Sequence, residues 1–280
     1  MTTEQGAAPA GDLDPRRVAD LLAPLGLPWP APVLLAATAS TNDEVEALAR
    51  AGAPEGACVV ADEQTAGRGR RDRTWSSPPG TGLLASVLVR PGEAPPELVA
   101  WLPLVAGVAA TDALAEACGV RAELKWPNDL VVVAAACGGS DGPRKLGGIL
   151  STVLPAGVSG DAAVVIGIGI NVALTSAELP VPRATSVLLE GGNADRGALL
   201  VALLVALHHR LDQWRSGHDA LRADYRARCA TIGRRVEVQL PGERVVSGIV
   251  TGIDDDGHLL VSDGESTSTV IAGDVIHATI

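Results

Sequence analysis

Apolar and polar positions follow one pattern up to about residue 231 and another beyond it. In the first part, short apolar runs typical of buried strands alternate with segments whose apolar residues recur every three to four positions, as in a helix. The clearest helical stripe consists of Leu199, Leu200, Leu203, Leu204, Leu207 and Leu211. This part of the chain is therefore predicted to fold as strands and helices around a shared core.

Strands are predicted at residues 58–61, 83–90, 122–124, 130–133, 147–153 and 164–170. Helices are predicted at residues 14–25, 45–52, 96–118 and 197–214, with a further helix that reaches about Cys229. Ser40, Thr41 and Asn42 offer capping side chains to the second helix, and Gly119 would end the third. We expect residues 1–12 to be disordered and the proline-rich residues 24–32 to form a linker.

After Ile232 the chain consists of short alternating or β-branched segments between Pro-Gly and Asp-Gly turns. Strands are predicted at residues 235–240, 244–253, 259–261 and 267–271. About fifty residues of short strands suggest a small barrel appended to a larger α/β domain. The predicted division is an N-terminal extension (1–31), a main domain (32–231) and a C-terminal domain (232–280).

Composition excludes several classes of protein. The formal net charge of -11 argues against nonspecific attraction to nucleic acid or an anionic membrane. The four cysteines show no paired spacing, so neither a disulfide framework nor a zinc site is expected. The amino terminus lacks the apolar core of a signal peptide, and the longest uncharged apolar run, residues 98–111, is too short to cross a bilayer. We expect a soluble, cytoplasmic protein.

One loop combines glycine with concentrated positive charge. Arg68, Arg70, Arg71 and Arg73 lie within six positions, and Gly67 and Gly69 alternate with them. Glycine frees the backbone to close around a ligand, and guanidinium groups bind carboxylate or phosphate with two parallel hydrogen bonds. The loop is thus either an anion clamp or a flexible basic surface loop.

Three other segments place polar groups beside apolar strands. Lys125-Trp-Pro-Asn-Asp129 forms a turn between strands, Lys145 precedes the glycine pair 147–148, and Gly167-Ile-Gly-Ile-Asn171 ends a strand with an amide. Such polar groups cost stability unless they are paired or used. Taken singly, each also fits an ordinary turn, strand-end lysine or flat strand.

In combination, these segments resemble those of biotin protein ligases of the type without a DNA-binding domain. The resemblance runs from about Leu34 to the carboxyl end. Its ordered motifs are Ser40-Thr-Asn42, Gln64-Thr-Ala-Gly-Arg-Gly-Arg70, Trp75-Ser-Ser-Pro-Pro-Gly80, Lys125-Trp-Pro-Asn-Asp-Leu130, Lys145-Leu-Gly-Gly-Ile-Leu150 and Gly167-Ile-Gly-Ile-Asn171. It implies an α+β fold: a class II synthetase-like catalytic domain with a mixed sheet, plus a small SH3-like C-terminal barrel.

The resemblance also implies a reaction in two steps. The carboxylate of biotin attacks the α-phosphorus of ATP to give biotinyl-5′-AMP, and a lysine of the biotin carboxyl carrier domain of an acyl-CoA carboxylase then takes the biotin. Magnesium is expected with ATP, although no dedicated cluster of metal ligands is found. The enzyme would be a monomer or a homodimer, with no specific DNA and no membrane among its partners.

By position, the resemblance assigns four groups of residues. Biotin would contact Ser40, Thr41, Asn42, Gln64, Arg68, Gly69, Arg70 and Lys145, and ATP would contact Trp75, Asn128 and Asn171. Catalytic charges would come from Arg68, Arg70, Lys125 and Lys145. Asp129 is the candidate to accept or steer the proton of the target lysine, of which only about 0.1% is neutral near pH 7.4 when it is free in solution.

Two features depart from the family pattern. Asp72 stands where a small residue is usual, and the hairpin between Val133 and Arg144 is longer than expected. That hairpin would be a tolerated insertion or a contact with the carrier or a partner subunit.

Competing interpretations belong to different functional classes. A lipoate or octanoate protein ligase would share the catalytic fold but would carry an Arg-Arg-x-Ser-Gly-Gly-Gly stretch that is absent here. A biotin-responsive transcriptional regulator would need an amino-terminal helix-turn-helix of about sixty residues. A peptide-binding module would need aromatic groove walls in the C-terminal domain, which has no aromatic residue.

Overall fold

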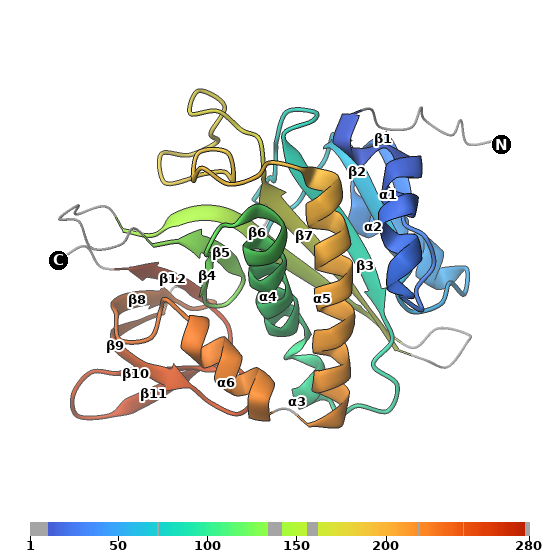
Figure 1. Cartoon of the computed structure of the whole chain (residues 1–280). Helices are drawn as coiled ribbons and strands as arrows, with labels where there is room; N and C mark the ends of the chain where they lie inside the picture. Colours follow the sequence, from blue (N-terminus) through green and yellow to red (C-terminus); the bar gives the residue numbers. More distant parts are fainter. Residues whose placement is uncertain are drawn as a thin grey trace.

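The computed structural model describes residues 11–71, 73–133, 142–155, 162–217, 219–242 and 244–277. A mixed seven-stranded sheet with the order β1-β2-β3-β7-β6-β5-β4 forms its centre (Figure 1). Only β1 and β2 pair in parallel; every other neighbouring pair is antiparallel. The strands are β1 (Val33–Thr38), β2 (Cys58–Gln64), β3 (Gly82–Val89), β4 (Glu123–Lys125), β5 (Asp129–Val132), β6 (Arg144–Leu154) and β7 (Ala163–Asn171).

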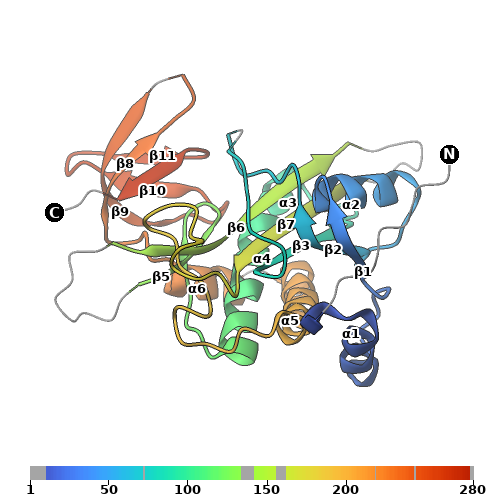
Figure 2. The same ribbon diagram turned by 90° about the horizontal axis from the view of Figure 1, so that it is seen from above.

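Helices cover both faces of this sheet unequally. Successive strand residues point to opposite faces. Cys58 and Val60 therefore join the core beneath α4 and α5, whereas Val59 joins a smaller core beneath α2. Figure 2 shows α2 on one side of the sheet and α4 and α5 on the other. The helices are α1 (Pro15–Leu22), α2 (Thr41–Arg50), α3 (Pro96–Val99), α4 (Leu102–Ala113), α5 (Arg196–Ser216) and α6 (Asp219–Arg228).

The predicted helix at 96–118 is interrupted. α3 ends at Val99, α4 begins at Leu102, and a π-helical turn runs from Leu114 to Cys118 before the left-handed Gly119 ends the segment. The buried Trp101 lies at the break and donates its indole N–H to the carbonyl of Asp255, 2.8 Å away. The segment is long and apolar enough to cross a membrane, but 67% of its apolar window is buried inside the protein, as in a core helix.

The C-terminal domain is an open five-stranded antiparallel sheet. Its order is β11-β10-β9-β8-β12, and no pairing between the edge strands β11 and β12 joins the described residues. The small barrel predicted for this domain is thus an open sheet among the described residues, and β12 was missed because it pairs with β8 across about thirty-five residues of chain. The strands are β8 (Arg235–Gln239), β9 (Val245–Ile253), β10 (Leu259–Ser262), β11 (Thr267–Val270) and β12 (Asp274–His277).

Specific hydrogen bonds attach this sheet to the main domain. Besides Trp101, the indole of Trp126 donates to the carbonyl of Gly257 at 2.9 Å, and the guanidinium of Arg226 donates to the carbonyl of Ile253 at 2.8 Å. The turn after β9 thus supplies acceptors to Arg226 of α6, and α4 supplies a carboxylate to Arg228 of the same helix.

The described amino-terminal residues pack against the main domain. The side chain of Asp12 accepts from the buried Arg196 at the start of α5, and Arg196 also pairs with Asp62 of β2. Leu13 is fully buried. The expected disorder is thus wrong for residues 11 and 12; residues 1–10 lie outside the described part.

Candidate functional site

A cavity of about 510 Å³ opens beside α2 on one face of the main sheet, and residues of β6 and β7 help to line it. Every site residue predicted from the sequence lines it: Ser40, Thr41, Asn42, Gln64, Arg68, Gly69, Arg70, Trp75, Lys125, Asn128, Asp129, Lys145 and Asn171. The fold thus brings together segments that are spread over 130 positions of the chain.

Glycines form the floor of this cavity. A Cβ atom on Gly167 would lie 2.2 Å from the side-chain oxygen of Asn42, and one on Gly169 would lie 2.7 Å from the indole of Trp75. Both glycines belong to β7, at positions where a side chain would face α2, as the side chain of Val165 does. The glycine alternation is therefore required because two side chains from other elements lie directly on the strand.

One end of the cavity is neutral and polar. The backbone N–H of Thr41 donates to the Gln64 side-chain oxygen at 2.8 Å, and the Thr41 hydroxyl lies 2.7 Å from that of Ser86. Ser86 in turn donates to the Asn42 oxygen at 2.6 Å. Ser86 is fully buried and was missed by the sequence interpretation, since a single serine in an apolar strand carries no signal by itself.

The expected cap of α2 differs from the observed one. Ser40 is the N-cap residue but makes no side-chain capping bond, and Thr41 and Asn42 are already helical. The side chain of Thr41 is held by Gln64 and that of Asn42 by Ser86, so the first turn of α2 helps to line the cavity.

The arginine loop, residues 67–75, is a small hairpin. The backbone N–H of Trp75 donates to the carbonyl of Gly67 at 2.9 Å, and that of Gly69 donates to the carbonyl of Arg73 at 2.6 Å. Arg71 at its tip is left-handed, with φ of 53°. Arg68 turns to Asp43 at the surface of α2. Asp72, a departure from the family pattern, lies outside the described residues.

Arg70 points into the cavity. Its guanidinium donates to the Asn128 side-chain oxygen and to the carbonyl of Gly273, each at 3.2 Å. Burial lowers its pKa from the ordinary value, while Asp274 acts in the opposite direction. This half-buried guanidinium is partly desolvated, which favours hydrogen bonds to an anionic ligand.

The C-terminal domain adds an acid to the cavity that the sequence interpretation missed. The Asp274 carboxylate pairs with Arg73 and lies 3.4 Å from Arg71 and 3.9 Å from Arg70. No local pattern identifies Asp274, because β12 reaches the arginine loop only through the tertiary fold.

Two lysines of the cavity share one carboxylate. The Asp129 oxygens lie 2.5 Å from the Lys145 ammonium and 3.7 Å from that of Lys125. Burial lowers the pKa of Lys125, with Lys145 acting in the same direction and Asp129 against it.

Two asparagines of the cavity lining hold neighbouring backbone segments. The amide of Asn128 donates to the carbonyl of Ile149 at 2.9 Å, and that of the buried Asn171 donates to the carbonyl of Thr185 at 3.0 Å. The indole N–H of Trp75 is buried and has no hydrogen-bond partner among the described residues. The long-hairpin residues 134–141 lie outside the described part.

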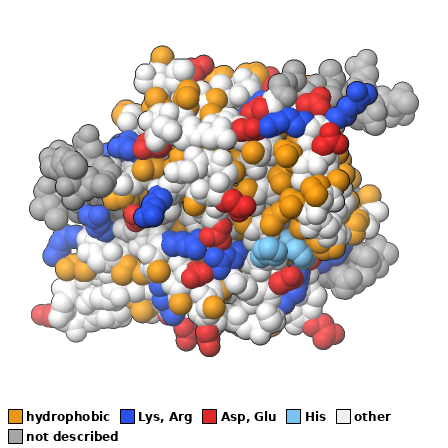
Figure 3. All heavy atoms as spheres, in the orientation of Figure 1, with side chains coloured by type: hydrophobic (Ala, Val, Ile, Leu, Met, Phe, Trp, Pro, Cys, Tyr) orange, Lys and Arg blue, Asp and Glu red, His pale blue; other side chains and the backbone are white. Residues whose placement is uncertain are grey.

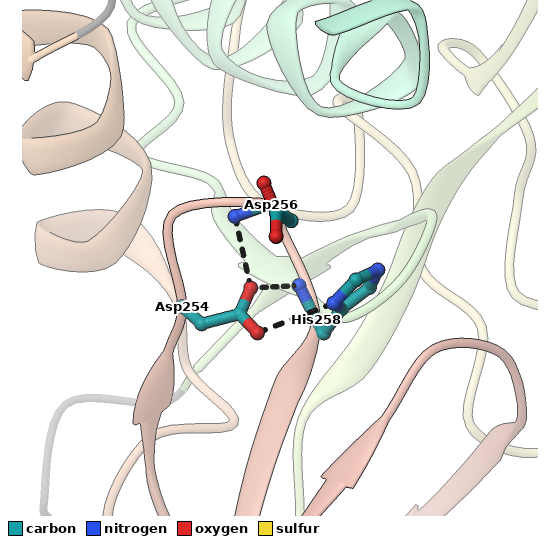
Figure 4. Close-up of side chains that lie close together, drawn as sticks. All are labelled: Asp254, Asp256 and His258. Carbon is teal, nitrogen blue, oxygen red and sulfur yellow. Dashed lines mark hydrogen bonds and ion pairs between the residues drawn. The ribbon is translucent and has the colours of Figure 1, made fainter. Parts of the chain in front are cut away.

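Two aspartates and a histidine form another cluster, in the C-terminal sheet. Asp254, Asp256 and His258 meet at the turn between β9 and β10 (Figure 4). One Asp254 oxygen accepts the backbone N–H groups of Asp256 and His258, and the other lies 3.2 Å from the His258 ring. These bonds confirm the turn expected from the sequence.

Comparison with known proteins gives two family matches. Residues 34–171 match the biotin/lipoate A/B protein ligase family, and residues 231–278 match the biotin protein ligase C-terminal domain.

Individual relatives agree with these matches. The chain is 41% identical to the biotin–[acetyl-CoA-carboxylase] ligase of Mycobacterium tuberculosis, covering 95% of this chain and 96% of that protein. It is 33% identical to the bifunctional ligase/repressor BirA of Bacillus subtilis over 84% of this chain and 70% of that protein. Among solved structures, the Aquifex aeolicus biotin protein ligase in complex with biotin and ATP superimposes with a TM-score of 0.72 at 27% identity, covering 88% and 99% of the two chains.

Proposed function

The chain belongs to the biotin protein ligases, and from this premise we propose how its cavity performs the reaction. It activates biotin with ATP as biotinyl-5′-AMP and transfers the biotin to a lysine of a biotin carboxyl carrier domain. One observation carries this assignment: a neutral polar pocket and a cluster of cations share one cavity above a glycine floor.

Biotin occupies the neutral end. Its ureido ring needs both hydrogen-bond donors and acceptors, and the network of Thr41, Asn42 and Gln64 supplies both. The residues proposed to contact biotin remain Ser40, Thr41, Asn42, Gln64, Arg68, Gly69, Arg70 and Lys145.

The cationic end serves the first step. A biotin carboxylate is ionised at neutral pH, so the barrier is its approach to the phosphates; two unit charges 4 Å apart repel by roughly 4 kcal/mol at an effective dielectric of 20. Arg70, Lys125 and Lys145 reach the cavity from three different segments. Positively charged groups fixed before the substrates arrive stabilise the charge that develops at phosphorus.

The adenosine part of ATP lies toward β6 and β7. Trp75 covers Gly148 and Gly169 there, and its indole edge forms an apolar wall for the base. Asn171 fastens the chain at Thr185, and Asn128 holds Arg70. In this proposal the two asparagines shape the nucleotide site as well as contacting it.

Magnesium enters as part of the ATP substrate. The cavity carboxylates among the described residues, Asp129 and Asp274, are both surrounded by cations, so they do not form a metal cage. Mg²⁺ commonly keeps phosphate and water as most of its ligands, and it would then screen the triphosphate charge.

In the second step a neutral lysine attacks the acyl carbon of biotinyl-5′-AMP, and AMP leaves. Asp129 is the proposed group that accepts or steers the proton of this lysine. Loop closure over the intermediate keeps water away from the anhydride.

The partner is a carrier domain of an acyl-CoA carboxylase, and the protein acts in the cytoplasm without specific DNA binding. Cys58, Cys118 and Cys229 are buried free thiols, which suits a reducing compartment. Acidic and basic side chains are interspersed on the face in Figure 3. With the net charge of -11, this surface does not favour a nucleic-acid backbone.

The decisive experiment is intact-mass analysis of a carrier domain incubated with enzyme, ATP and either biotin or lipoate. We expect a mass gain of one biotinyl group, and no gain with lipoate. A lipoyl gain alone would overturn the biotin assignment, and no gain with either acid would overturn the ligase assignment.

A further inference from the structure

We infer that Asp274 is a positioning residue that fastens the arginine loop to the C-terminal sheet and so aims Arg70 into the cavity. The inference deepens the proposed function, on which it rests for the role of Arg70.

The first support is the concentration of charge at one carboxylate. Asp274, with only 13% of its side chain exposed, pairs with Arg73, Arg71 and Arg70. Three guanidinium groups so close together repel one another. A shared counter-ion is what allows them to gather on one side of a nine-residue loop.

The second support is that the backbone of the same sheet edge also binds the loop. Asp274 of β12 and Gln239 of β8 are register partners. The carbonyl of Gln239 accepts from Arg71 at 2.8 Å, and that of Gly273, next to Asp274, accepts from Arg70. The end of the β8–β12 pair is thus a docking edge for the loop.

The third support is a division of roles among the arginines. Arg73 and Arg71 have 66% and 37% of their side chains exposed and make their contacts with the sheet. Arg70, at 26%, also donates to Asn128 of the cavity lining. Arg71 and Arg73 therefore anchor the loop, which leaves Arg70 available to the substrate.

The consequence concerns the intermediate. A loop fastened at its tip to β12 forms a cover over the activated acyl group, whereas an unfastened loop opens more often. Asp274 thereby links the C-terminal domain to the retention of biotinyl-5′-AMP.

The first test is limited trypsin digestion, because Arg70, Arg71 and Arg73 are cleavage sites. We expect Asp274→Asn to accelerate cleavage within the loop of the ligand-free enzyme by about tenfold, as one strong charge-assisted contact is lost. Asp274→Glu, which keeps the charge, should restore most of the protection. Glu237→Gln removes an exposed acid from the neighbouring strand β8 and is the matched control, with unchanged cleavage.

The second test measures the release of preformed biotinyl-5′-AMP. We expect Asp274→Asn to release it about tenfold faster, while the melting temperature of the protein and the protection of its other trypsin sites stay close to those of Glu237→Gln. Equal loop cleavage in Asp274→Asn and the wild type would overturn the inference, as would global loss of protection in both Asp274 variants. If the wild type forms no biotinyl-5′-AMP, the proposed function fails, but the ligand-free digestion still decides whether Asp274 fastens the loop.

Discussion

The side chain of Asn42 lies directly over the backbone of Gly167. A Cβ atom at position 167 would be 2.2 Å from the Asn42 oxygen, which is itself held by the Ser86 hydroxyl at 2.6 Å. The first turn of α2 and the middle of β7 can therefore approach each other only because residue 167 has no side chain. This contact fixes the neutral end of the cavity.

Gly167→Ala should weaken biotin binding. The added methyl group displaces Asn42 from the neutral end of the cavity, and the loss of one hydrogen bond to biotin costs about 0.5–1.5 kcal/mol, or roughly twofold to tenfold in affinity. Isothermal titration with biotin measures it. Gly252→Ala in β9, where the nearest atom would be 4.0 Å away, is the control. Equal biotin affinity in both variants would show that Asn42 does not bind the ligand.

Substitution of Asp129 tests adenylate formation and biotin transfer separately. Asp129 contacts both Lys145 and Lys125, so Asp129→Ala should slow adenylate formation. Because Asp129 is also proposed to handle the proton of the target lysine, transfer from preformed biotinyl-5′-AMP should slow as well. Single-turnover transfer to the carrier domain is the measurement, with an expected loss of about a hundredfold. Slow adenylate formation with normal transfer would rule out the proton-handling role.

Arg70 should contribute more to activation than Arg68. Arg70→Gln removes a half-buried cation from the reacting phosphate, and we expect biotin-dependent pyrophosphate exchange to fall by about a hundredfold. Arg68→Gln should have a smaller effect, since Arg68 pairs with Asp43 on the surface. Arg50→Gln, a surface change on α2 outside the cavity, serves as control. Unchanged exchange after joint neutralisation of Arg68, Arg70 and Lys145 would contradict the proposed function.

The lowered pKa of Lys125 predicts that pyrophosphate exchange depends on pH. Burial lowers its pKa below the ordinary value of 10.5, so its charge is present below this lowered pKa and is lost as the pH rises through it. Pyrophosphate exchange should therefore decline on the alkaline side at a lower pH than a free lysine would give. In Lys125→Arg, whose guanidinium stays charged above pH 12, that decline should move to higher pH. An identical alkaline limb in both proteins would assign it to another group.

Substitution of Arg196 should lower the stability of the fold markedly. Its side chain, 4% exposed, holds Asp12 and Asp62 together. Arg196→Ala leaves two half-buried carboxylates without their shared cation and should lower the free energy of unfolding by about 1–3 kcal/mol in urea titrations. Arg50→Ala breaks only the exposed pair with Glu46 and should cost about 0.5 kcal/mol. Similar losses in the two variants would mean that the buried network is energetically unimportant.

Most elements of the main sheet could be predicted from the sequence, because their apolar runs and stripes are visible in short stretches of the chain. The apolar run at Cys58–Val60 and the leucine stripe of α5 both appear at the predicted places. β1 was missed, since its apolar run follows directly on a proline-rich stretch and pairs only with β2. The break at Trp101 was missed for a related reason: the acceptor of its indole lies in the C-terminal sheet.

The amino-acid sequence by itself determined the chemistry of this protein. Its ordered motifs supplied the cations, amides and glycines of the cavity, because each motif is a short run whose residue types carry their own charge and backbone freedom. Only the tertiary structure decided which groups meet: that Ser86 lies beneath Asn42, that Lys145 and Lys125 share Asp129, and that Asp274 gathers three arginines. Such contacts join residues up to about two hundred positions apart, and their partners follow from how sheets and helices pack, which no local pattern of the chain contains.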